Sequence, residues 1–245
     1  MERILKSACY RVNHNGDYNR SFQTRLRRNY RSHPEIVNLF NHLFYNNQLL
    51  PLAKENVELI CKKWSRLPNT KYPILFHSVD GIAETENNST SIYNWREIDV
   101  VIHYVKDLLK INFKDFKITE DDIGIISPYK LQYIKIKNAL ADHDLSKITI
   151  GSPETFQGSE KPIIIVSFVR SKTRALGFLT NEKRLNVTIS RPKSMLILIG
   201  NAETLKINSN FKFIIDSCIA HKSFIKSAFA EKPDTLDDLL KKLKI

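Results

Sequence analysis

Gly151-Ser-Pro-Glu-Thr-Phe-Gln-Gly-Ser-Glu-Lys-Pro-Ile-Ile-Ile-Val-Ser-Phe-Val-Arg170 is the stretch that decides the fold. It places a short polar segment directly before the apolar run at residues 163–168. A run without alternating polar residues is typical of a strand that is buried on both faces, as in a parallel sheet. Open parallel sheets bind ligands at their strand ends, so the polar groups beside this strand form a candidate site. The alternative is an ordinary loop before a core strand.

Strands and helices alternate along the rest of the chain. Other predicted strands span residues 73–79, 122–127, 147–151 and 195–200. One helix is predicted to start at Pro34, and another to follow the cap Asn94. Further helices are predicted at residues 130–142, at 183–190 with Asn181 as its cap, and at 211–224. This order predicts one α/β domain with a mainly parallel sheet flanked by helices.

The ends of the chain are less regular. We predict a short helix at residues 1–10, a half-exposed strand at 22–26 and a surface loop at 81–93. The domain is expected to span residues 1–225, with a partly ordered C-terminal tail at 226–245. Because the first helix has no cap before it, we expect the domain to be part of a longer protein.

The composition favours a polyanionic partner. Lys and Arg number 38 against 26 Asp and Glu, which gives a formal net charge of +12. This excess favours nucleic acid over an acidic protein, although a solvated basic surface without a function is the alternative.

Cysteine content and hydropathy exclude several classes. The cysteines Cys9, Cys61 and Cys218 form no CxxC pair, which is typical of reduced thiols in an intracellular protein and predicts neither a zinc site nor a disulfide framework. The sequence contains no signal peptide and no run of the ~20 apolar residues that a membrane span needs. We therefore predict no metal ligands and no membrane span in this chain.

Three polar segments carry groups suited to binding a nucleotide. They are Asn29-Tyr-Arg-Ser-His-Pro34, Gln157-Gly-Ser-Glu160 and Arg184-Leu-Asn-Val-Thr-Ile-Ser-Arg191. A planar guanidinium matches phosphate oxygens, a Tyr ring stacks on a base, and a carboxylate accepts hydrogen bonds from ribose hydroxyls. Each segment alone is weak evidence, but together they indicate a nucleotide site.

Four segments together resemble motifs of Upf-like superfamily 1 helicases. The segment at 29–34 resembles the motif IV region, and Ser127-Pro-Tyr-Lys-Leu-Gln132 resembles the Thr/Ser-Pro-Tyr-x-x-Gln segment that follows it. Thr155-Phe-Gln-Gly-Ser-Glu160 resembles motif V, and the segment at 184–191 resembles motif VI. The resemblance covers residues 26–201 and implies the second RecA-like domain of such a helicase, a three-layer α/β fold. The strand at 72–78 and Gly177-Phe-Leu179 make the chain similar to the Armitage and Moloney-leukaemia-virus-10 type of RNA helicase.

The resemblance implies a role for each nucleotide-binding residue. Tyr30 is expected beside the adenine, while Arg31 and Arg191 act as catalytic residues that reach the γ-phosphate, Arg191 as an arginine finger. Glu160 is expected to hold the ribose, and Gly158 to let the backbone approach the nucleotide. The alternatives are structural ion pairs for the arginines, a solvated surface acid for Glu160 and simple packing for Tyr30.

A second surface is expected to bind single-stranded RNA. In members of this family, hydroxyls and backbone amides at strand ends line a phosphate track. The residues that match are Ser127, Pro128, Tyr129, Ser152 and Thr155. DNA is an alternative track, because no residue reads the 2′-hydroxyl.

Half of the ATPase machinery is absent from the sequence. No Gly-x-x-x-x-Gly-Lys-Ser/Thr occurs, and no apolar strand ends in an Asp-Glu pair that would organise magnesium. The resemblance assigns both to a first RecA-like domain, the expected partner, so ATP with Mg²⁺ is the expected cofactor of the complete protein and the isolated chain is expected to be inactive.

The resemblance further implies small-RNA (piRNA-type) silencing, silencing proteins as partners, and a cytoplasmic location that includes ribonucleoprotein granules. A non-catalytic RNA- or protein-binding adaptor is the alternative from another class.

Motif VI departs from the family pattern in one place. Ser190-Arg191-Pro192 stands where Thr-Arg-Ala is usual. Because Pro192 disfavours helical geometry in the residue before it, we expect Arg191 just past the end of its helix.

Overall fold

The computed structural model describes residues 10–11, 18–19, 21–53, 59–86, 89–113 and 116–226. Its centre is a six-stranded, all-parallel sheet in the order β12-β3-β11-β10-β8-β9. These strands are β3 (Ile74–Ser78), β8 (Ile123–Ile126), β9 (Thr149–Gly151), β10 (Lys161–Ser167), β11 (Pro192–Gly200) and β12 (Phe224–Lys226). The α/β, RecA-like fold predicted from the sequence is confirmed.

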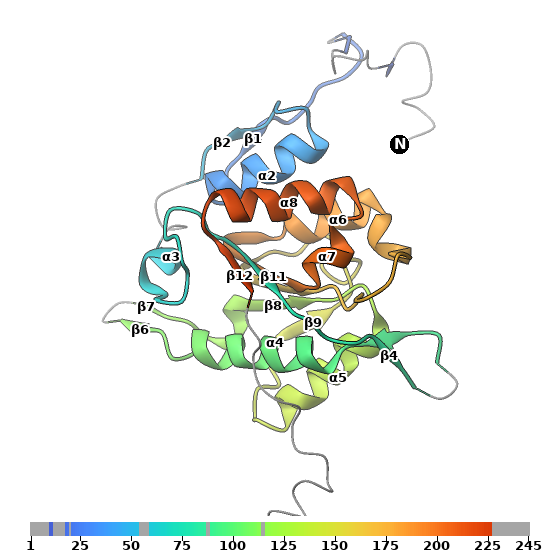
Figure 1. Ribbon diagram of the computed structural model, residues 1–245. Coiled ribbons are helices and arrows are strands. Elements are labelled where there is room, and N and C mark those ends of the chain that lie inside the picture. The colour runs from blue at the N-terminus through green and yellow to red at the C-terminus, as the bar shows by residue number, and fades with distance from the viewer. Residues whose placement is uncertain are drawn as a thin grey trace, which may run out of the picture.

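Helices cover both faces of the sheet (Figure 1). One face carries α3 (Leu59–Lys63), α4 (Trp95–Leu108) and α5 (Lys130–Ala141). The other face carries α2 (Pro34–Phe44), α6 (Glu182–Ile189), α7 (Ala202–Leu205) and α8 (Ser209–Ala220). The molecule therefore has three layers.

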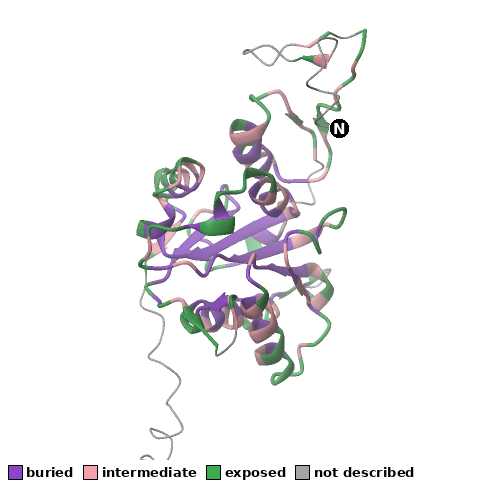
Figure 2. Cartoon of the chain, turned by 90° about the vertical axis from the view of Figure 1, so that its right-hand side faces the viewer, coloured by how far each residue is buried: buried purple, intermediate pink, exposed green. Residues whose placement is uncertain are grey.

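The apolar run of β10 is buried because it contributes to two cores. Ile164 and Val166 pack into the core beneath α2, α6 and α8, whereas Ile163 and Ile165 pack into the core beneath α4 and α5. Alternate side chains of a strand point to opposite faces, so each core receives every second residue. Figure 2 shows the buried sheet between layers that are partly exposed.

Side chains cap the helices at the predicted starts. His33 precedes α2 and accepts a hydrogen bond from the Glu35 backbone N–H at 3.2 Å. Asn94 caps α4, and Asn181 caps α6 by accepting from two backbone N–H groups. These caps confirm the predicted helix starts, because each satisfies N–H groups that lack a partner within the helix.

Two predicted elements are wrong. Residues 22–26 form no strand, and Phe22 and Leu26 are 53% and 92% exposed, because no core lies opposite their alternating side chains. The nearest strand is instead β1 (Arg28–Asn29), which pairs with β2 (Leu50–Pro51). The helix predicted to reach Phe224 ends at Ala220, and Phe224 begins β12 at the edge of the sheet.

Shorter elements complete the described part. The predicted loop at 81–93 contains a hairpin of β4 (Glu84–Thr85) and β5 (Ile92–Tyr93). A second hairpin joins β6 (Asn112–Phe113) to β7 (Phe116–Lys117), and two 3₁₀ turns are η3 (Glu120–Asp122) and η4 (Gly177–Thr180). The predicted helix at 1–10, apart from Tyr10, and the tail beyond Lys226 lie outside the described residues.

The connection from β9 to β10 crosses β8 without a helix. Residues 152–160 run from the carboxyl end of β9 to the amino end of β10 through a series of turns. Phe156 in this connection is fully buried, and a Cβ on Gly124 of β8 would lie 2.7 Å from its ring. The glycine therefore permits the close packing of the crossover on the sheet.

Candidate nucleotide and nucleic-acid sites

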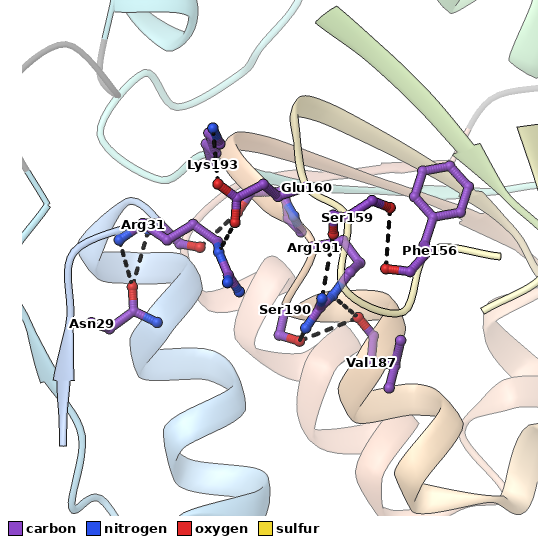
Figure 3. A network of polar contacts seen from close by, with 11 residues as sticks. Asn29, Arg31, Phe156, Ser159, Glu160, Val187, Ser190, Arg191 and Lys193 are labelled. Atoms are coloured by element: carbon purple, nitrogen blue, oxygen red, sulfur yellow. Dashed lines mark hydrogen bonds and ion pairs between the residues drawn. The ribbon is translucent and has the colours of Figure 1, made fainter. Parts of the chain in front are cut away.

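Three predicted nucleotide-binding residues meet at the amino ends of β10 and β11 (Figure 3). Glu160 directly precedes β10, Arg191 directly precedes β11, and Arg31 lies in the turn before α2. That turn is docked onto β11, since Ser32 Oγ donates to the Pro192 carbonyl at 2.7 Å. The contact fixes one wall of the site, although its partners are far apart in the sequence.

Glu160 is the anionic centre of this cluster. Its carboxylate forms an ion pair with the Arg31 guanidinium and lies 3.0 Å from Lys193 Nζ. Partial burial opposes ionisation, but the hydrogen bond from Lys193 and the charge of Arg31 outweigh it and lower the pKa of Glu160. Glu160 is therefore ionised and bound to two cations.

Arg191 lies just past the C-terminal end of α6, as predicted. Its guanidinium donates to the carbonyls of Val187 and Ser159 at 3.0 and 3.3 Å, and to Ser190 Oγ at 2.9 Å. Burial and the nearby charge of Arg31 lower its pKa. The side chain is thus held at the helix end, beside but not paired with Glu160 in the described structure.

Tyr30 and Gly158, the other two predicted nucleotide-binding residues, are both accessible. Tyr30 is 63% exposed, so its aromatic side chain is accessible to a ligand. Gly158 has φ +85°, a left-handed conformation that favours glycine, and no atom lies within 4 Å of the position that a Cβ would take. The backbone at residue 158 is therefore accessible.

Lys193 is a member of the cluster that the sequence analysis missed. It pairs with Glu160 from the second residue of β11. A signal was present, because Arg191 and Lys193 stand two residues apart at the start of a strand and so point to the same side.

The predicted RNA-binding residues lie at the opposite, carboxyl edge of the sheet. Ser127 directly follows β8, and Ser152 directly follows β9. Ser152 is half-buried and Thr155 exposed, and the Ser152 backbone N–H donates to Thr155 Oγ1 at 3.3 Å. This edge therefore presents hydroxyl groups in an ordered turn.

Two of the predicted RNA-binding residues have buried side chains. Ser127 is fully buried and Tyr129 is 4% exposed. The Tyr129 hydroxyl accepts from Arg170 Nε at 2.9 Å and donates to the Leu176 carbonyl at 3.4 Å. The Ser127 hydroxyl and the Tyr129 ring are thus used in packing, which leaves Pro128 as the half-buried member of this segment.

A buried polar network behind this edge was also missed. Glu97 is fully buried, and its carboxylate accepts from Ser167 Oγ at 2.6 Å and from the Val169 N–H at 2.9 Å. Gln132 Nε2 donates to Ser167 Oγ at 2.8 Å. Burial raises the pKa of Glu97 to about 7. No local pattern marks Glu97, because it occupies the same helix face as apolar core residues.

Comparison with known proteins shows the family of the chain. Residues 4–203 match a family described as an AAA domain. Over 91% of this chain, the sequence is 37% identical to putative helicase mov-10-B.1 of Danio rerio. Over 90% of this chain, it is 35% identical to RNA helicase Mov10l1 of Mus musculus. It is 30% identical to probable RNA helicase armi of Drosophila melanogaster over 91%. The chain belongs to the Upf1-like superfamily 1 helicases.

This helicase domain spans 24% of the fish relative and 20% of each of the other two. The residues of the Glu160 cluster have groups that suit a nucleotide, because Arg31 and Lys193 pair with one carboxylate, Arg191 lies beside it and Tyr30, next to Arg31 in the chain, is exposed. In the described part of the helicase domain, no helix has the length and apolar character to cross a membrane.

Proposed function

We propose that the chain is the C-terminal half of an ATP-dependent RNA helicase core. It supplies Arg31, Arg191, Tyr30 and Glu160 to an ATP site that a first RecA-like domain completes. The observation that carries the proposal is the convergence of two arginines and Lys193 around Glu160 at one edge of the sheet. Cations so placed favour a polyphosphate ligand.

Each side chain has a defined task in this proposal. Tyr30 stacks on the adenine, and Gly158 allows the backbone to approach the nucleotide. Arg31 exchanges its ion pair with Glu160 for phosphate oxygens, which frees the Glu160 carboxylate to accept hydrogen bonds from ribose hydroxyls. Arg191 extends from the end of α6 and stabilises the charge on the transferred phosphoryl group. Magnesium ligands come from the first domain.

The carboxyl edge of the sheet binds single-stranded RNA in the same proposal. Ser152 and Thr155 supply hydroxyl groups, Pro128 supplies apolar contact, and Ser127 and Tyr129 shape the surface from below. Support comes from the exposure of Thr155, the partial exposure of Pro128 and Ser152, and relatives whose names call them RNA helicases. We propose small-RNA silencing as the pathway on the basis of this resemblance.

ATP hydrolysis by the full-length protein tests the role of Arg191. We expect Arg191→Ala to lower RNA-stimulated kcat by about 1,000-fold or more, because an arginine finger acts on the transition state. RNA affinity should stay within about twofold. Arg66→Ala is the control, since it removes the same type of side chain where Arg66 pairs with Asp107, outside the Glu160 cluster.

Glu160→Ala separates the proposed enzyme from a non-catalytic adaptor. We expect an increased KM for ATP and reduced hydrolysis with intact folding. Unchanged hydrolysis in both Arg191→Ala and Glu160→Ala would contradict the proposal and support the adaptor, while equal stimulation by RNA and single-stranded DNA would contradict RNA as the track.

A further inference from the structure

A crevice of about 760 Å³ lies at the carboxyl edge of the sheet between β3 and β11. These strands are neighbours, but the chain leaves β3 toward α4 on one face and leaves β11 toward α7 and α8 on the other. Connections that diverge in this way open a crevice where parallel α/β sheets bind ligands. None of the predicted site residues lines it.

The walls of the crevice are cationic. Five basic and two acidic side chains line it: Arg96, Lys172, Arg174, Lys206, Lys226, Asp80 and Glu203. Lys226 and Glu203 are 3.8 Å apart, and Lys172 lies 3.4 Å from Asp80, with both members of each pair well exposed. Such pairs contribute little and exchange readily for another anion. Arg174 is exposed and forms no ion pair with any residue in the described ranges.

The backbone that carries Lys172 and Arg174 is held in a defined conformation. Val169 and Lys172 have backbone φ angles of 69° and 53°, which are unusual for residues other than glycine. Glu97 accepts from the Val169 N–H, and the Lys172 N–H donates to Thr204 Oγ1 at 2.9 Å. These bonds fix the segment that follows β10 across the mouth of the crevice, so its cations are positioned in advance.

The same segment reaches the proposed RNA surface. Arg170 begins it and bonds to the Tyr129 hydroxyl, and Phe178, which ends it, is 61% exposed with its ring centroid 6.4 Å from that of Tyr129. Positive charge therefore continues along the carboxyl edge from Tyr129 into the crevice. A chain of phosphates fits such a path better than one small anion does.

We propose that this crevice binds the backbone phosphates of single-stranded RNA where the strand extends beyond the Pro128 and Thr155 surface. The inference rests on the proposed function and deepens it, because it extends the RNA path across β10 to the β3–β11 junction. Arg174 and Lys172 are the principal contacts, since neither is committed to a buried partner.

Binding of RNA oligonucleotides of different length by the full-length protein tests this inference. We expect Arg174→Glu to weaken binding of an oligonucleotide of about 16 nucleotides by tenfold or more and to reduce its salt slope by about one. An oligonucleotide of about 6 nucleotides should bind as it does to the wild type. Lys110→Glu is the control, because it makes the same charge change on an exposed side chain outside the crevice. Lys110 follows the C-terminal end of α4, whereas Arg96 near its N-terminal end lines the crevice.

The outcomes distinguish the two proposals. If the wild type binds RNA but Arg174→Glu and Lys110→Glu behave alike, the crevice inference is wrong and the proposed function stands. If Arg174→Glu loses only the binding of pyrophosphate or ADP, the crevice is a small-anion site and the inference is overturned. If the wild type binds neither the long nor the short oligonucleotide, both the crevice inference and the proposed RNA-binding function are overturned.

Discussion

A single buried carboxylate shapes the backbone at the end of β10. Glu97 comes from α4, yet it satisfies the backbone N–H of Val169, a β-branched residue in the left-handed region. That conformation costs free energy and persists only where surrounding bonds hold it. Glu97 therefore positions the segment from Arg170 to Phe178, on which Arg170, Lys172 and Arg174 stand.

The stability of the chain should depend on pH through Glu97. Burial raises its folded pKa from the ordinary value of 4.5 to about 7, so the folded state binds a proton between these values and the unfolded state does not. Stability should fall as pH rises from below 4.5 to above 7, by roughly 3 kcal/mol in total. Urea unfolding at several pH values measures it.

Glu97→Gln is the control for this dependence. It keeps the size of the side chain and an acceptor for the Val169 N–H but cannot ionise. The difference in unfolding free energy between wild type and variant should therefore change as pH rises through 7 and become constant about one unit above it. Tyr129, which lies nearby, stays neutral throughout because burial raises its pKa. A difference that is independent of pH would refute the assignment.

At the scale of elements, the crossover from β9 to β10 determines the separation of the two proposed sites. Parallel strands are usually joined through a helix. Here residues 152–160 pass over β8 as turns anchored by Phe156. Their first residues lie at the carboxyl edge and their last, Glu160, at the amino edge. One short segment thus touches both the proposed RNA surface and the proposed nucleotide site.

Gly124→Ala should destabilise the chain by about 1–3 kcal/mol. The new methyl group would lie 2.7 Å from both the Phe156 ring and Ile164 Cδ1, so the crossover must shift. In a double-mutant cycle with Phe156→Leu, the pair should cost less than the sum of the single substitutions, because the smaller side chain relieves the overlap. Additive unfolding free energies would show that the crossover does not press on Gly124.

At the scale of the whole molecule, the proposed nucleotide-binding groups and the proposed RNA surface occupy opposite edges of one sheet. The Glu160 cluster provides cations and a carboxylate, but the 245 residues contain no phosphate-binding Gly-x-x-x-x-Gly-Lys-Ser/Thr loop. On the proposed function, this chain alone cannot align a water molecule, magnesium and the γ-phosphate.

The isolated chain should therefore hydrolyse ATP no faster than buffer, with or without RNA. Adding the first RecA-like domain as a separate chain should restore a rate that depends on RNA and on Arg191. A phosphate-release assay measures both. Robust turnover by the 245-residue chain alone, still present after repeated purification, would contradict this view.

Patterns within short segments were predictable. The uninterrupted apolar run of β10, the caps Asn94 and Asn181 and the position of Arg191 past its helix follow from local rules of burial, hydrogen bonding and proline geometry. The strand predicted at residues 22–26 failed because alternation indicates a strand only where a core lies opposite, which the local sequence does not reveal.

The sequence by itself determined the three-layer α/β fold, the helicase family and the residue types of the candidate sites, because these reside in local patterns and motifs. The tertiary structure decided that Glu160 and Arg191 lie at the amino edge, that Ser127 and Tyr129 are buried, and that Lys193 joins the cluster. These facts depend on strand order and on crossovers, which bring together groups far apart in the chain.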